Sequence, residues 1–199
     1  MTKTIFTFLF AGTLLATQPS PSFGSVPGKL AASVDSGSVE FNATGRPSAL
    51  KIKGVGTSPK GTLLTEGDFV SGNISFDLDS LETGIKLRDE HMKTKYLETG
   101  KYREAVFTIT KLPVPQGLRN SSTTIDAIPF QGVLSLHGTQ RPVSGKARVE
   151  REGDKLKIAA DFGIKVSDFN IPTPGFAGIT MAEDVQVLVR FTAPVSQKE

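Results

Sequence analysis

The sequence has no cysteine and no tryptophan, and only two tyrosines and two histidines occur among its 199 residues. The absence of cysteine excludes disulfide bonds, thiol catalysis, cysteine-ligated metal sites and a lipid anchor on cysteine. The folded chain must therefore be stabilised by a hydrophobic core and a closed network of backbone hydrogen bonds. The length suits one domain of ordinary size.

Clustered positive charge is also missing, because the formal net charge is +3 and no run of five or six lysines and arginines occurs. With so few aromatic rings for base stacking, this pattern argues against a nucleic-acid partner. Beyond the N-terminus, no segment approaches the roughly 20 apolar residues that span a bilayer. We therefore expect no stable membrane span. The sequence is compatible with either a monomer or a homodimer.

The N-terminus has the pattern of a secretory signal peptide. Lys3 precedes an apolar stretch over residues 5–16, which is too short to cross a membrane. The triplet Ser22-Phe23-Gly24 is a candidate cleavage site, and residues 16–18 are a second one. The competing interpretation is a buried first strand or helix. We predict an exported protein with a signal peptide over residues 1–24 and a single domain over residues 25–199.

Most of the mature chain alternates apolar and polar residues, which is typical of strands with one buried face. The longest run is Leu156, Ile158, Ala160, Phe162, Ile164 and Val166. Turn-forming residues separate the runs, such as Glu152-Gly153-Asp154, a predicted hairpin, and Gly54-Val55-Gly56. The charged segment 83–102 departs from this pattern and predicts a short helix ended near Gly100.

Antiparallel strands of this kind pack either as a barrel or as a sandwich. About eight of them can close into a barrel that holds one small ligand and leaves no sheet edge exposed. In a β-sandwich, the same apolar faces would pack on each other. The alternation by itself does not choose between the two architectures.

Several motifs resemble the YceI-like family of periplasmic polyisoprenoid-binding proteins. Residues 79–84 read DSLETG, residues 88–92 read RDEHM, and Tyr96-Leu97 follows. Residues 132–143 read GVLSLHGTQRPV, which is similar to the family's strand and turn, and residues 185–191 resemble its last strand. The chain departs from the family at Arg103-Glu104, where a proline often follows the position of Tyr102.

The resemblance implies an antiparallel lipocalin-like β-barrel of about eight strands with a short helix, located in the periplasm or secreted. It also implies a lipid ligand, either a polyisoprenoid or an isoprenoid quinone, held without catalysis and without a cofactor. Two alternatives from other classes are an enzyme that acts on a lipid in the same lumen and an adhesion or structural β-sandwich with no ligand.

The alternation selects the residues that would line such a lumen, because inward and outward side chains alternate along a barrel strand. These are Ile74, Phe76, Phe107, Ile109, Leu134, Leu136, Ala160, Phe162 and Ile164. Thirteen phenylalanines in the chain would suit a ligand that offers no hydrogen bonds.

The charged motif formed by Arg88, Asp89 and His91 could in principle hold a metal or act as an acid–base pair. Its spacing does not match a zinc-binding helix, and no third ligand is evident. We therefore assign it a structural role in anchoring the helix. We predict no catalytic and no metal site, because no Gly-x-Ser-x-Gly motif is present and His137 lies on the polar face of its strand beside a turn.

Overall fold

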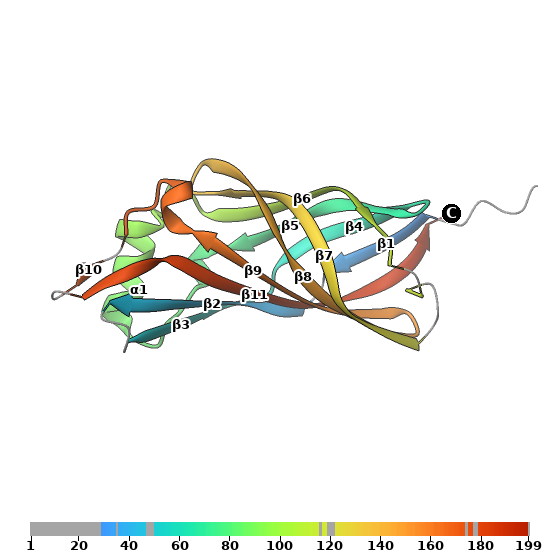
Figure 1. Cartoon of the computed structure of the whole chain (residues 1–199), viewed down its shortest axis with the longest axis horizontal. Helices are drawn as coiled ribbons and strands as arrows, with labels where there is room; N and C mark the ends of the chain where they lie inside the picture. The colour runs from blue at the N-terminus through green and yellow to red at the C-terminus, as the bar shows by residue number, and fades with distance from the viewer. Residues whose placement is uncertain are drawn as a thin grey trace, which may run out of the picture.

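The computed structural model describes residues 29–34, 36–46, 50–115, 117–118, 122–173, 175–176 and 179–198. The predicted signal peptide over residues 1–24 lies outside these described residues. The described chain folds as one antiparallel sheet with short helical segments at one end of an elongated molecule (Figure 1). No helix in this described part of the chain is long and apolar enough to span a bilayer.

The elements follow one another as strands with two helical interruptions. The first five strands are β1 (Lys29–Val34), β2 (Ser36–Arg46), β3 (Lys51–Gly56), β4 (Lys60–Glu66) and β5 (Phe69–Asp77). A 3-10 turn η1 (Leu78–Ser80), the helix α1 (Lys86–His91) and a π-helical turn η2 (Met92–Tyr96) come next. The remaining elements are β6 (Glu104–Pro113), β7 (Ser122–Leu136), β8 (Thr139–Glu152), β9 (Lys155–Lys165), the 3-10 turn η3 (Val166–Phe169), β10 (Gly175–Phe176) and β11 (Ile179–Lys198).

The sheet closes into a barrel because β1 pairs with both β4 and β11. Among the described strands, the closed ring therefore runs β1-β4-β5-β6-β7-β8-β9-β11, which is eight strands. The long β11 pairs with β1 near the C-terminus and with β2 over its earlier part. The pairs β1–β4 and β2–β3 share one register, so β1 and β2 together lie along β4 and β3 as in one long hairpin. The predicted barrel is confirmed and the sandwich is excluded.

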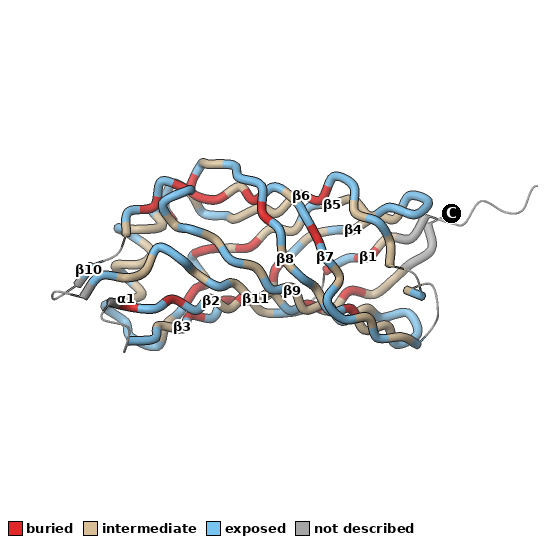
Figure 2. Tube along the Cα trace, viewed as in Figure 1, coloured by how far each residue is buried: buried red, intermediate tan, exposed pale blue. Residues whose placement is uncertain are grey.

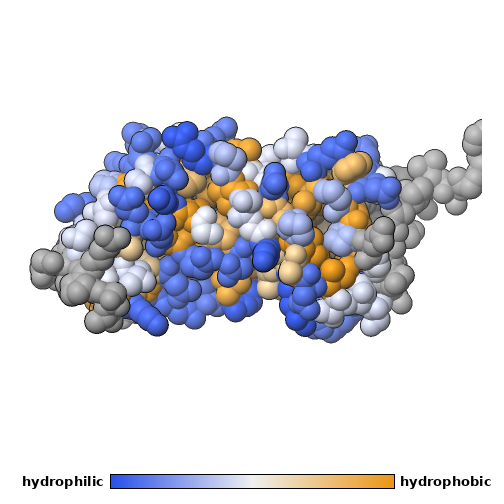
Figure 3. Space-filling view, in the orientation of Figure 1, coloured by the Kyte–Doolittle hydropathy of each residue, from blue (hydrophilic) through white to orange (hydrophobic). Residues whose placement is uncertain are grey.

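The alternation of apolar residues places one face of each strand toward the barrel interior. Figure 2 shows buried and exposed residues alternating along the strands, as a period of two requires. In Figure 3, hydrophilic side chains cover most of the visible face, with apolar groups showing between them. The predicted hairpin at residues 152–154 joins β8 to β9, and Gly153 takes the positive φ of 62° that its turn needs.

One expected break is wrong: Gly54-Val55-Gly56 lies inside β3, where Val55 also pairs with Glu82. Each of the two glycines lets a phenylalanine ring lie directly against the strand backbone. A Cβ on Gly54 would overlap the ring of Phe41 on the neighbouring strand, and a Cβ on Gly56 would overlap the ring of Phe76. Glycine here serves side-chain packing within a strand, and no turn forms.

Candidate functional site: an apolar cavity along the barrel

The barrel encloses a cavity of about 820 Å³ that is lined mainly by aliphatic and aromatic side chains. Ile85 and Leu87 line it at the helical end, whereas Gly67, in the β4–β5 turn, and Leu118 line it at the opposite end. The cavity therefore runs along the long axis of the molecule. Its size falls in the range of small-molecule sites, which extends to about 1,000 Å³.

All nine residues selected from the alternation lie on the wall of this cavity. They come from β5, β6, β7 and β9, and four of them are buried, namely Phe76, Ile109, Leu134 and Leu136. That they contact a ligand remains a prediction.

Three phenylalanines from different strands meet on one side of the lumen. The ring of Phe107 lies 5.7 Å from that of Phe130 in an edge-on arrangement and 6.3 Å from that of Phe162 in a stacked one. The rings of Phe130 and Phe162 are 6.1 Å apart. All three line the cavity. Such pairs stabilise the wall beyond the burial of their surface, and they present a surface without hydrogen-bonding groups to the lumen.

Glycines behind four phenylalanine rings of the barrel let the rings lie against the wall instead of filling the lumen. A Cβ would overlap a phenylalanine ring at each of four positions, which pair as Gly54 with Phe41, Gly56 with Phe76, Gly132 with Phe107 and Gly145 with Phe130. Because interiors are close-packed, a ring without this recess would have to turn elsewhere. The glycines thus help to keep the cavity open.

Sequence reasoning missed lining residues that follow irregularities in the strands. The β5–β6 register shifts between Val70 and Gly72, so Ile109 and Leu112 both line the cavity although they differ in parity. The β7–β8 register shifts between Ile125 and Ile128, where the intervening Ala127 has a φ of 55°. A β-bulge of this kind reverses the parity of a strand. The sequence signal for such a bulge is an aliphatic residue, such as Leu112, that breaks the alternation of apolar and polar residues in its strand.

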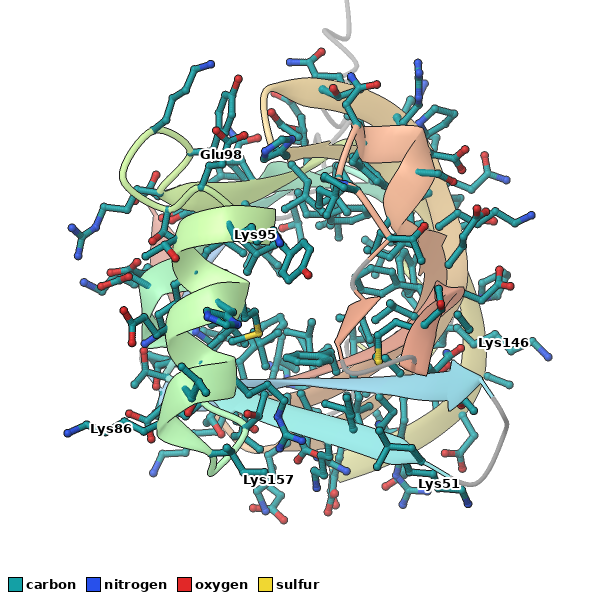
Figure 4. The ribbon with its side chains drawn as sticks, turned by 90° about the vertical axis from the view of Figure 1, so that its left-hand side faces the viewer. Lys51, Lys86, Lys95, Glu98, Lys146 and Lys157 are labelled. Atoms are coloured by element: carbon teal, nitrogen blue, oxygen red, sulfur yellow. The ribbon has the colours of Figure 1, made fainter. Side chains whose placement is uncertain are left out.

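The helical segment forms one side of the cavity mouth. Figure 4 looks into this end, with the helix on the left and the strands around the opening. Arg88, His91, Met92 and Tyr96 line the cavity. The hydroxyl of Tyr96 accepts a hydrogen bond from the Gly175 amide and lies 3.3 Å from the Gly175 carbonyl oxygen, so it links the helix to β10.

Thr83 is the centre of the anchor that was assigned to Arg88 and Asp89. Arg88 Nε donates to Thr83 Oγ1 over 2.7 Å, and its Nη2 donates to the Thr83 carbonyl over 2.8 Å. The Asp89 carboxylate accepts from the Thr83 amide over 2.7 Å and from the Thr83 hydroxyl. The two charged side chains thus hold the helix start through Thr83, which the sequence motif includes but which we did not single out.

The two histidines take different positions. His91 lines the cavity beside Arg88, whereas His137 is buried outside it, between Glu98, Tyr102 and the carbonyl of Phe169. Within the described ranges, no group of three or more histidine, aspartate and glutamate side chains could hold a metal ion. Among the described residues lining the cavity, the ionisable ones are Arg88, His91, Tyr96 and Arg151.

Comparison with known proteins agrees with this architecture. The YceI protein of Escherichia coli O157:H7 is 30% identical over 108 residues, which cover 51% of this chain and 52% of that protein. The protein of Shigella boydii matches to the same extent. The alignment therefore spans about half the length of the curated relatives.

Two solved structures share the fold. A polyisoprenoid binding domain from Saccharophagus degradans, implicated in plant cell wall breakdown, superposes with a TM-score of 0.64 at 19% identity, over 84% of this chain and 99% of that one. BcnA from Burkholderia cenocepacia superposes with a TM-score of 0.59 at 17% identity, over 77% and 95%.

The family model described as the YceI-like domain matches residues 22–193, which include every strand of the closed ring in whole or in large part. The predicted resemblance is confirmed, and the chain belongs to the YceI-like family.

Proposed function

We propose that the protein binds a long apolar lipid, a polyisoprenoid or an isoprenoid quinone, in its lumen and carries or sequesters it without catalysis. The observation that supports this most directly is the continuous apolar cavity of about 820 Å³ along the barrel axis. A solid core would have filled this volume with side chains. The binding named for the Saccharophagus degradans domain of the same fold supports the choice of ligand.

The energetics suit a ligand that is held by its tail. Each buried CH₂ contributes about 0.8 kcal/mol, so a five-carbon isoprene unit contributes roughly 4 kcal/mol before costs. A few units would match the roughly 8 kcal/mol of micromolar binding. The lumen wall formed by Phe107, Phe130 and Phe162 supplies such contacts without requiring a particular head group.

The non-enzymatic assignment is supported by the wall of the cavity, where the described lining includes no carboxylate. Arg88 is engaged with Thr83 through two hydrogen bonds. General acid–base catalysis most often uses a positioned histidine, aspartate or glutamate, and among the described lining residues His91 alone is of these types.

Mass spectrometry of lipid extracted from the purified protein tests the proposal. We expect one or a few long-chain isoprenoid species in the wild-type protein. Ala160 lies opposite Ala147 and Val189 and lines the cavity, so Ala160→Phe should displace lipid while the melting temperature is kept. The neighbouring Ala159 lies opposite Arg148 and Arg190 and does not line the cavity, so Ala159→Phe is the matched control. Lost stability without any lipid ever present would refute the proposal, because overpacking of a solid core costs about 1–3 kcal/mol.

We also propose export to the periplasm or beyond the cell, with removal of the first 24 residues. The support is the apolar stretch after Lys3 and the small-x-small triplet Ser22-Phe23-Gly24. N-terminal sequencing of the mature protein should give a start within a few residues of Ser25. A start at Met1 in secreted protein would contradict the proposal.

A further inference from the structure

The mouth of the cavity carries an exposed apolar rim. Six large hydrophobic residues are exposed in the described part of the chain. Three of them, Leu50 at 37%, Ile85 at 53% and Leu87 at 53%, also line the cavity. A residue that both lines a cavity and meets solvent lies at its opening. Single exposed hydrophobic residues need no explanation, but a group around one opening indicates a contact surface.

Lysines flank this rim directly along the chain. Lys51 follows Leu50, and Lys86 lies between Ile85 and Leu87. Figure 4 shows both lysines at the circumference of the mouth, together with Lys95 on the helical segment. Within the described part of the chain, the ammonium groups of Lys51 and Lys86 form no hydrogen bond or ion pair, whereas their backbones take part in β3 and α1.

Two carboxylates near the rim are bound to other groups, and four others are exposed around the opening. Asp89 is occupied by Thr83, and Glu98 faces His137 at the other end of the helical segment. Glu82 precedes α1 and Glu90 lies within it, and both are exposed; Glu183 and Asp184, near the start of β11, are exposed as well. Lys51 on β3 and Lys86 on α1, which are next in sequence to Leu50, Ile85 and Leu87, place positive charge at two separate points around the mouth (Figure 4).

We propose that this rim seats the mouth of the barrel on the surface of a membrane that contains anionic lipid. The apolar side chains enter the boundary between head groups and acyl chains, and the lysines reach the phosphates. The lumen then faces the bilayer, so an apolar chain passes between the two without crossing water. This inference rests on the proposed function, since a lipid cargo is what the mouth would exchange.

Flotation with lipid vesicles tests the inference independently of cargo. The wild-type protein should float with vesicles of phosphatidylglycerol and phosphatidylcholine and much less with phosphatidylcholine alone. The double variant Lys51→Glu/Lys86→Glu should bind the anionic vesicles at least about tenfold more weakly, because each lysine near an anionic surface is worth about fivefold. Neither lysine lines the cavity, so the amount of lipid that co-purifies with this double variant should stay at the wild-type level.

A second variant removes the apolar part of the rim. Ile85→Ser/Leu87→Ser should weaken vesicle binding by about tenfold or more, because two aliphatic side chains no longer enter the membrane. Two matched controls lie elsewhere. Phe69, exposed at 38%, starts β5 at the opposite end, and Lys146 projects from the wall of β8 (Figure 4). Phe69→Ser and Lys146→Glu should float like the wild type.

Three results would overturn the inference. They are wild-type protein that does not float with anionic vesicles, rim variants that float as well as the controls, and a dimer in sedimentation that Ile85→Ser/Leu87→Ser converts to a monomer. The last result would assign the rim to a second copy of the chain. Wild-type flotation with no co-purified lipid would instead refute the proposed function and leave the membrane contact standing.

Discussion

Nε2 of His137 lies 2.8 Å from Oε2 of Glu98, although 39 positions separate the two residues in the chain. Both residues have positive φ, 50° for His137 and 46° for Glu98, which is uncommon outside glycine. Nδ1 of the same imidazole lies 3.2 Å from the carbonyl oxygen of Phe169, and the ring packs 4.4 Å from Tyr102. One buried side chain therefore joins the β7–β8 turn, the end of the helical segment and η3.

Removing this imidazole should destabilise the fold and leave the lumen intact. We expect His137→Ala to lower the free energy of unfolding by about 2 kcal/mol, because polar groups of the interior lose their partner. Glu98→Gln should cost less, about 1 kcal/mol or below, because the Glu98 side chain is 47% exposed. Urea unfolding of the two single variants and the double variant measures the coupling. Fully additive effects would show that the two side chains do not act together.

The Thr83 anchor predicts a difference between two similar substitutions. Thr83→Val keeps the branched shape but loses the hydroxyl that accepts from Arg88 and donates to Asp89. We expect it to lower the free energy of unfolding by about 1–3 kcal/mol. Thr83→Ser keeps the hydroxyl and is the matched control.

Asp89→Asn tests the same anchor through its charge. The change nearly keeps the shape, and we expect lower stability by about 1–3 kcal/mol, since hydrogen bonds to a charged group are lost. Thermal melting monitored by circular dichroism gives the measurement. An unchanged melting curve together with a lost enzymatic turnover would contradict the structural role of Arg88 and Asp89.

We expect the ion pairs of Glu40 to stabilise the fold in a pH-dependent way. Lys53 and Arg190 lie 2.8 and 2.6 Å from its carboxylate, on the two strands that flank β2. The hydrogen bond from Lys53 is the main cause that holds the pKa of Glu40 below its ordinary 4.5, against a smaller opposing effect of burial. Because the pKa is lower in the folded state, the contribution is complete above pH 4.5 and is lost as the pH falls through the folded value.

We therefore expect Glu40→Gln to lower the free energy of unfolding by about 1 kcal/mol at neutral pH, as for a charge network whose lysine and arginine are exposed. The difference from the wild type should disappear in acid, once the wild-type carboxyl is protonated. Urea unfolding at a series of pH values between neutral and strongly acidic measures both. A difference that is the same at every pH would mean that the ion pairs do not contribute.

A side chain added at Gly54 should reduce the volume of the lumen by displacing Phe41. An added methyl group at this position would overlap the ring of Phe41, which lines the cavity and would have to turn into it. Gly54→Ala should thus reduce co-purified lipid and cost about 1–3 kcal/mol of stability. Gly163→Ala is the matched control, because a Cβ there would meet only the end of Gln186 at 3.5 Å. Equal lipid content in the two variants would show that Phe41 does not control the volume of the lumen.

The local pattern of the sequence was sufficient to identify the inward face of most strands. Side chains alternate with a period of two along any strand, so runs such as Leu156 to Ile164 placed their apolar residues on the cavity wall whatever the partner strands are. The helical segment was also predictable, because its charge and lack of proline are local properties. The family motifs added the barrel and its expected ligand, which alternation did not.

Only the tertiary structure decided which strands pair to close the barrel, because this pairing joins segments that are far apart in the chain. Lys29 pairs with Lys198, and nothing in either segment by itself requires that partner. The same holds for the register shift that brings Leu112 to the lumen, for the glycine in β3 that makes room for Phe41, and for Thr83 as the junction of two charges. Alternation reports which face of a strand is apolar, whereas the space left between those faces depends on how all the strands pack together.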